Sequence, residues 1–323
     1  MTIFKFEPIY KKRIWGGTNI ISEFQRPKIS CDEPIGESWE IVDRKENQSV
    51  AINDTLKNKT LRYIIQNHSN MFMGPNWDPK NEFPILVKWL DCNARLSLQV
   101  HPPTKIAKSI NGEPKTENWY IAYATDDAAI FAGLRKGTTR AEFEEAIKTG
   151  TAQEHCHRLK SETGMSLLVE SGRLHAIDAG NLILEIQQNS DTTYRVFDWG
   201  RKDLNGKSRE LHIEESIKSI NFDDFEPSLL ETIEQNGNQT IAECEEFRIR
   251  KYNLNVNEIL DIKSENEDCM LIHNVKGRIL VDDFSISMGE HGLSPFSDSC
   301  SVRAVEESTI LITDKFTRYS DLN

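Results

Sequence analysis

The sequence predicts a mainly β protein, built as a barrel-like sandwich with a few helical segments. Short stretches in which apolar and polar residues alternate recur along most of the 323 residues, and turn residues separate them. Helical spacing of apolar residues is confined to two segments, at about 54–80 and 138–163. Many short strands interrupted by few helices are typical of all-β sandwiches and barrels.

Length and composition indicate an ordinary globular protein of one large or two medium domains. Hydrophobic residues make up 38% of the chain and charged residues 28%. No apolar run approaches the ~20 residues of a membrane helix, and the first residues lack the cleavage pattern of a signal peptide. The six cysteines show no CxxC spacing. We therefore expect reduced thiols and a cytoplasmic location.

The formal net charge of −12 argues against nucleic acids and anionic membranes as partners, because both need a basic face. An anionic small molecule remains compatible with this charge, since a pocket can be basic while the outer surface is acidic. We expect a monomer or a weak homodimer.

The first half of the chain alternates strands with one helix. Residues 36–42 show the two-residue period of a strand, and residues 61–72 (LRYIIQNHSNMF) carry an apolar stripe at helical spacing. Residues 84–91 (PILVKWLD) are typical of a buried strand. We expect this strand to continue through residues 92–95 into a strand at 96–101, as a hairpin.

Two further strands, expected at 115–123 and 126–133, precede a helical hairpin. Thr139 and Glu142 have the spacing of a capping box that begins its first helix, and Thr151 could begin the second.

This second helix would carry His155 and His157. Two residues apart on a helix, their side chains point to different sides, so we do not expect them to chelate one ion.

Short strands return between residues 165 and 201, and again between 241 and 323. Residues 221–240 are acidic and polar, and we interpret them as a linker. The chain is therefore divided into two domains, at residues 1–235 and 236–323.

The stretch LSLQVHPP at residues 96–103 places polar side chains on one side of a strand and apolar side chains on the other. The two prolines end the strand, since neither can donate to a ladder. This pattern suits a metal pocket inside a β-barrel, and it also suits an ordinary half-buried strand. Its polar members are Ser97, Gln99 and His101.

Four metal-capable residues lie on expected strands in the first two-thirds of the chain: Gln99, His101, Glu117 and His175. Two imidazoles, one carboxylate and one amide oxygen are suitable ligands for zinc or another divalent ion. Chain position does not bring these side chains together, and each of them could be purely structural.

The sequence resembles the type I phosphomannose isomerases, in their short bacterial form. The matching segments occur in the family's order between residues 10 and 217: YKKRIWGG (10–17), IGESWEI (35–41), PILVKWLD (84–91), LSLQVHPP (96–103), KTENWYIA (115–122), GRLHAI (172–177), EIQQNSDTTYRVFDWGR (185–201) and RELHIEESI (209–217).

The resemblance implies two cupin (jelly-roll) barrels with a small helical insertion, the first catalytic and the second degenerate. It also implies a sugar-phosphate substrate, with interconversion of mannose 6-phosphate and fructose 6-phosphate through an enediol. One Zn²⁺ per chain would be bound by the residues at Gln99, His101, Glu117 and His175.

The resemblance further assigns a functional arginine to Arg195, which we expect to face the pocket and stabilise the enediolate. The alternative is an ion pair of Arg195 with Asp191 or Asp198. Lys115 would act as a proton shuttle or as a phosphate anchor. Candidates for substrate binding are Ser97, Glu185 and Gln187.

Two other functions remain open for a cupin with these residues. Two histidines and a glutamate can also hold iron, as in a metal-dependent oxygenase. A non-catalytic sensor would bind the sugar phosphate without turnover, since a fold alone does not determine function.

Overall fold

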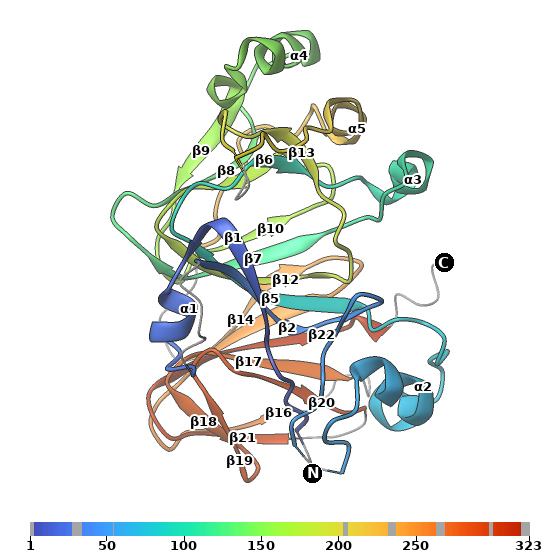
Figure 1. Ribbon diagram of the computed structural model, residues 1–323. Coiled ribbons are helices and arrows are strands. Elements are labelled where there is room, and N and C mark those ends of the chain that lie inside the picture. The colour runs from blue at the N-terminus through green and yellow to red at the C-terminus, as the bar shows by residue number, and fades with distance from the viewer. Residues whose placement is uncertain are drawn as a thin grey trace.

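Two antiparallel sheets form the N-terminal half of the molecule (Figure 1). The computed structural model describes residues 3–27, 34–53, 55–202, 206–231, 237–262, 269–296 and 300–317. In sheet order, the six-stranded sheet contains β1 (Ile9–Gly17), β2 (Ile35–Ile41), β5 (Ile85–Cys92), β12 (Asn181–Gln188), β7 (Glu117–Ala124) and β10 (Ser166–Val169). The five-stranded sheet contains β13 (Tyr194–Phe197), β6 (Leu98–Val100), β11 (His175–Ile177), β8 (Ala129–Leu134) and β9 (Cys156–Lys160). A short ladder joins β3 (Asp43–Arg44) to β4 (Asn47–Gln48).

The C-terminal half repeats this two-sheet arrangement. Its five-stranded sheet has the order β14 (Gly237–Glu243), β15 (Arg248–Leu254), β22 (Ser308–Asp314), β17 (Met270–Lys276) and β20 (His291–Ser294). Its four-stranded sheet has the order β16 (Ile259–Ile262), β21 (Cys300–Ala304), β18 (Arg278–Val281) and β19 (Phe284–Ser287). The predicted mainly β class is confirmed, whereas the description as two cupin barrels stays a prediction.

The central strands of the six-stranded sheet are buried on both faces. Val87 and Trp89 of β5 belong to a core shared with Leu271 and Leu311 of the C-terminal half, whereas Leu90 packs inside the N-terminal half. Every residue of β5 and of β12 is buried. A strand covered on both sides has no face that water would require to be polar, which explains why six of the eight residues of β5 are apolar.

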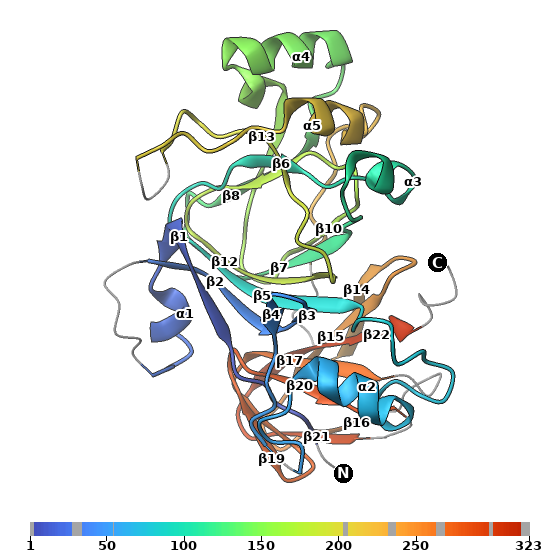
Figure 2. The same ribbon diagram turned by 45° about the vertical axis from the view of Figure 1, so that its right-hand side comes forward.

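Helices lie outside the sheets. Figures 1 and 2 show α3 (Thr104–Ala107), α4 (Arg140–Thr149) and α5 (Ile213–Ser219) on the outer side of the five-stranded sheet of the N-terminal half. Two further short elements are α1 (Asn19–Ser22) and the 3₁₀ turn η1 (Lys108–Ile110). The expected capping box between Thr139 and Glu142 is present at the start of α4. None of the helices in the described part of the chain combines the length and apolar character needed to cross a bilayer.

The predicted helix at residues 61–72 is present as α2 (Leu61–Phe72), and Thr60 caps its first turn by accepting from the Tyr63 amide. Phe72 is fully buried, whereas Met71 is 48% exposed, so Phe72 continues the apolar stripe. The Phe72 ring lies 4.5 Å from that of Phe4, and its carbonyl accepts from the amide of Phe296. Helix α2 therefore contacts both the N-terminal segment and the C-terminal half.

We expect Phe72→Ala to lower the free energy of unfolding by about 3–5 kcal/mol, because it removes a buried ring that the surrounding core cannot fully replace. Urea denaturation measures the change. Met71→Ala is the control, since an exposed substitution one residue away is expected to stay within about 0.5 kcal/mol. Equal effects of the two substitutions would contradict this description of the core.

Two predictions of local structure are wrong. Strands β5 and β6 do not form a hairpin, because residues 93–97 cross to the opposite sheet, where the Leu96 amide donates to Ile177. The expected second helix after Thr151 is a single 3₁₀ turn, η2 (Ala152–His155), followed by strand β9. Pairing with β8 and burial of Cys156 outweigh the local helical pattern there. The predicted domain boundary at residue 235 lies outside the described residues and stays a prediction.

Candidate metal centre and active site

Strand register brings three predicted site residues together on the five-stranded sheet. Gln99 of β6 lies opposite His175 of β11 on one side and opposite Arg195 of β13 on the other. Directly paired residues point to the same face of an antiparallel sheet. These three side chains, which are widely separated in the sequence, therefore form one row.

The six-stranded sheet supplies the other wall. Glu117 of β7 lies opposite Gln187 of β12, and Trp119 lies opposite Glu185. The Trp119 indole donates to the Glu185 carboxylate over 3.0 Å, and its ring packs edge-on against His175 at 5.4 Å. The two rows thus face each other across the interior of the N-terminal half.

His101, Glu117 and His175 form a buried cluster whose ligand atoms all lie within 4.8 Å of one another. The Glu117 carboxylate oxygens lie 3.4 Å from Nε2 of His101 and 3.7 Å from Nε2 of His175. Among the described residues, this is the one group of three or more His, Cys, Asp or Glu side chains with that geometry. Two imidazoles and one carboxylate are a common ligand set for zinc and iron.

Both imidazoles are held in the form that binds a metal. Nδ1 of His101 lies 2.9 Å from the Thr192 carbonyl, and Nδ1 of His175 lies 2.8 Å from the Arg173 carbonyl. A carbonyl only accepts, so each Nδ1 carries the proton and each Nε2 presents its lone pair toward Glu117. Burial lowers the pKa of His101 to about 4 and also lowers the pKa of His175, so both rings are neutral at pH 7.

The Lys115 ammonium lies against this cluster. It contacts the Glu117 carboxylate and lies 3.1 Å from Nε2 of His101 and 3.7 Å from Glu185. Burial alone would lower the pKa of Lys115, but the carboxylates of Glu117 and Glu185 outweigh it and raise that pKa. Burial would raise the pKa of Glu117, yet Lys115 and then His101 hold it well below its usual value. Glu117 therefore stays ionised, as a metal-binding carboxylate must.

Gln99 and Ser97 lie next to the cluster but differ in whether they reach the neighbouring cavity. The Gln99 amide donates to Ser97 Oγ over 2.9 Å, which orients its carbonyl oxygen away from that hydroxyl. Gln99 lines a cavity, whereas Ser97 is buried and does not. The role of Gln99 as a fourth ligand and the role of Ser97 in substrate binding stay predictions.

The cavity beside the cluster has a volume of about 510 Å³ and an excess of positive charge. Its wall contains six cationic side chains and three carboxylates, although the whole chain carries a net charge of −12. Such a cavity raises the local concentration of anions. The cations are Lys12, Arg13, Lys88, Lys115, Arg195 and Arg209, and the carboxylates are Glu37, Glu185 and Asp191.

Arg195 lines this cavity, and its guanidinium donates to the Glu210 carbonyl over 2.7 Å. Among the described residues, no carboxylate forms an ion pair with Arg195. Asp198, one of the two partners considered above, is bound instead by Arg201 and Arg209, each at 2.7 Å. Burial, and then the nearby Arg209, lower the pKa of Arg195, which reflects how closely cationic groups crowd this wall.

Of the two candidates on β12, only Glu185 reaches the cavity. Its carboxylate also pairs with Lys88 at 3.5 Å. The Gln187 amide is instead fully buried and donates to the carbonyls of Gln188 and Ser190, both at 2.7 Å. The substrate-binding role of Gln187 stays a prediction, and Gln187 does not line the cavity.

Sequence reasoning missed several cations of the cavity wall. Lys88 lies in the middle of a buried strand whose one other charged residue is Asp91, and a buried charge at that position was a usable signal. Arg13 and Arg209 lie in segments that carry the family resemblance, but no pattern within those segments indicates that they face a common cavity.

The chain is similar to known proteins in both sequence and structure. Residues 3–122 match the family described as phosphomannose isomerase type I, catalytic domain. The mannose-6-phosphate isomerase ManA of Bacillus subtilis is 37% identical over 304 residues, which are 90% of this chain and 92% of that protein. The mannose-6-phosphate isomerase of Streptococcus mutans is 39% identical over 207 residues, or 64% of each chain.

Among solved structures, the crystal structure of the mannose 6-phosphate isomerase from Bacillus subtilis superposes with a TM-score of 0.85 and 28% identity. The match covers 97% of this chain and all of that one. Fold and site together define a β-sandwich enzyme with a candidate metal centre at the edge of a cationic cavity. The chain belongs to the type I phosphomannose isomerase family.

Proposed function

We propose that this chain is a zinc-dependent aldose–ketose isomerase that interconverts mannose 6-phosphate and fructose 6-phosphate through an enediol. The observation that carries the proposal is the buried His101–Glu117–His175 cluster, which presents two Nε2 lone pairs beside a cationic cavity. The relatives named as mannose-6-phosphate isomerases support the same substrate.

Zinc suits the cluster because two neutral histidines and one carboxylate satisfy its preference for nitrogen and oxygen ligands. Gln99 on the adjoining strand would supply a further oxygen. One carboxylate leaves the bound ion with surplus positive charge, so it would act as a Lewis acid toward oxygens of the sugar.

Side chains of the protein would transfer the proton during the reaction. Aldose–ketose isomerisation removes a proton from the carbon next to the carbonyl and returns a proton to the neighbouring carbon. Lys115 lies at the cluster end of the cavity and within 3.7 Å of Glu185, so we assign proton transfer to this pair. This assignment favours the shuttle role of Lys115 over the anchor role.

Arg195 would stabilise the negative charge that develops on the enediol oxygens. Its guanidinium stays charged and can donate two hydrogen bonds to neighbouring oxygen atoms. The other cations of the wall, among them Arg13 and Arg209, would provide the positive potential that a phosphate group requires.

A coupled assay of mannose 6-phosphate conversion tests the proposal, with and without prior treatment by a chelator. We expect treatment to abolish turnover and added Zn²⁺ to restore it, with about one metal ion bound per chain. Turnover that persists in metal-free protein would remove the zinc mechanism. Oxygen uptake would indicate an oxygenase, and tight binding of sugar phosphate without conversion would indicate a sensor.

A further inference from the structure

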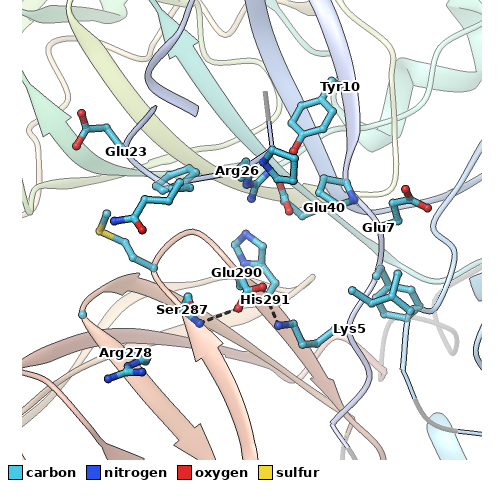
Figure 3. Close-up of a pocket in the computed structure, with 18 of the residues that line it drawn as sticks. Lys5, Glu7, Tyr10, Glu23, Arg26, Glu40, Arg278, Ser287, Glu290 and His291 are labelled. Carbon is cyan, nitrogen blue, oxygen red and sulfur yellow. Dashed lines mark hydrogen bonds and ion pairs between the residues drawn. The ribbon is translucent and has the colours of Figure 1, made fainter. Parts of the chain in front are cut away.

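The molecule has a second cavity, of about 980 Å³, between the N-terminal segment and the C-terminal half. Strand β2 separates it from the cationic cavity, because Glu37 lines the cationic cavity and Glu40, of opposite parity, lines the second one. Each of the three cations of the second cavity has a carboxylate partner, and Figure 3 shows the pairing of Lys5 with Glu290. Within the described residues, the second cavity therefore offers no unpaired cation to an anionic ligand.

The two walls of the cationic cavity differ in how their charges are matched. On the six-stranded sheet, Arg13 pairs with Glu37 at 2.7 Å and Lys88 pairs with Glu185 at 3.5 Å. Asp191, the third carboxylate of the cavity, is exposed, so water screens its charge. The excess of positive charge is therefore to be found on the opposite wall.

On the opposite wall, three arginines share one buried carboxylate. Asp198 accepts from Arg201 and from Arg209, each at 2.7 Å, and burial followed by the charges of these two arginines lowers the pKa of Arg195. Glu210, which also lies near Arg195, is exposed, so water screens its charge. Three guanidinium groups and one carboxylate leave two positive charges, and a phosphate monoester carries a charge of about −1.5 to −2 at pH 7.

The chain between β13 and α5 is folded so that Arg209 returns to the cavity. Trp199 has a φ of 58°, a left-handed conformation that is costly for a large side chain, and its indole donates to the Leu96 carbonyl over 2.6 Å. An antiparallel bridge then pairs Lys202 with Ser208. The bend and the bridge together bring Arg209 back to the carboxylate that precedes the bend.

Arg209 lies at the far end of a row that begins at the metal cluster. In strand order, His175 is followed by Gln99 and then by Arg195. The next segment outward contains Arg209 and His212, and the His212 amide donates to the Arg195 carbonyl over 2.9 Å. A hexose 6-phosphate likewise has its reacting carbons and its phosphate at opposite ends. A sugar whose reacting carbons lie at the cluster would therefore direct its phosphate toward Arg209.

We propose that Arg209 binds the phosphate group of the substrate and that Asp198 is the positioning residue that holds Arg209 in place. This inference rests on the proposed isomerase function, since it assigns the phosphate end of that substrate. Asp198 accepts from Nε and Nη2 of Arg209, which leaves Nη1 to donate to a phosphate oxygen. The contact selects phosphorylated sugars over free sugars.

Calorimetric titration with sorbitol 6-phosphate tests the contact, because this compound carries the phosphate but has no carbonyl group to isomerise. We expect saturable binding by the unaltered protein and at least tenfold weaker binding by Arg209→Gln. Arg140→Gln is the matched control, since Arg140 also pairs with a carboxylate, that of Glu144 at 2.7 Å, but lies on α4 outside the cavity. The control is expected to bind as tightly as the unaltered protein.

Asp198→Asn separates positioning from simple attraction, because it raises the net charge of the wall by one. If the wall acted only through its positive potential, this variant would bind sorbitol 6-phosphate more tightly. Because Asp198 holds Arg209 in place, we expect at least several-fold weaker binding instead. Thermal unfolding checks that the variant is folded, and the Arg209→Gln titration decides the phosphate contact independently of it.

Steady-state kinetics distinguish failure of this inference from failure of the proposed function. We expect Arg209→Gln to raise KM for mannose 6-phosphate at least tenfold and to leave kcat within about twofold. Turnover by the unaltered protein, combined with undiminished affinity of Arg209→Gln or tighter binding by Asp198→Asn, would overturn this inference alone. Binding that depends on Arg209 in a protein without turnover would support the phosphate site and overturn the isomerase function.

Discussion

Replacing His101 with alanine is expected to abolish stoichiometric metal binding and to lower kcat/KM for mannose 6-phosphate by more than about 100-fold. Changes to groups that merely orient a metal ligand cost about 10–100-fold in affinity or activity, so loss of a ligand itself should cost more. The substitution leaves one imidazole and one carboxylate in the cluster. Elemental analysis after dialysis and the coupled assay measure the two effects.

His157→Ala is the matched control, because His157 lies on β9, outside the cluster. It is expected to keep both metal and activity. Thermal unfolding of both variants distinguishes loss of the site from loss of the fold. A His101→Ala protein that retains one metal ion and normal turnover would show that the ion binds elsewhere.

Replacing Lys115 with methionine is expected to lower kcat by about 10²–10⁴-fold and to leave KM nearly unchanged. This range is typical of a missing general acid–base group. Methionine keeps most of the buried volume but removes the ammonium that contacts Glu117 and lies near Glu185. Steady-state kinetics with metal-loaded protein separate kcat from KM.

The same kinetics decide between the two roles of Lys115. A phosphate anchor would instead show a raised KM with kcat largely retained, and that result would refute the proton-transfer assignment. Lys108→Met is the control, since Lys108 is an exposed lysine of η1 that does not line the cationic cavity. It should leave both constants unchanged.

Local periodicity predicted the secondary structure correctly where an element's own residues determine its conformation. The apolar stripe of residues 61–72 and the capping box at Thr139 are reproduced in α2 and α4. Local periodicity failed where pairing with strands distant in the sequence determines the conformation. Residues 156–160 pair with β8 and extend despite the helical pattern before them, and β5 and β6 enter different sheets although they are neighbours in the sequence.

Within the site, the sequence resemblance identified candidate residues but did not show which of them line the cavity. Glu185 and Gln187 have the same parity on β12, yet only Glu185 lines the cavity, because the Gln187 amide donates to the carbonyls of Gln188 and Ser190 at the end of the strand. Lys88 was overlooked, although its pairing with Glu185 makes it part of the wall.

The sequence by itself determined that the protein is mainly β, that it belongs among the phosphomannose isomerases, and which side chains have the chemistry to bind a metal. Only the tertiary structure decided that His101, Glu117 and His175 meet, that cationic side chains gather beside them, and that a second cavity lies behind β2. The physical reason is that a two-residue period specifies the face of a strand, whereas its neighbours and register depend on long-range pairing.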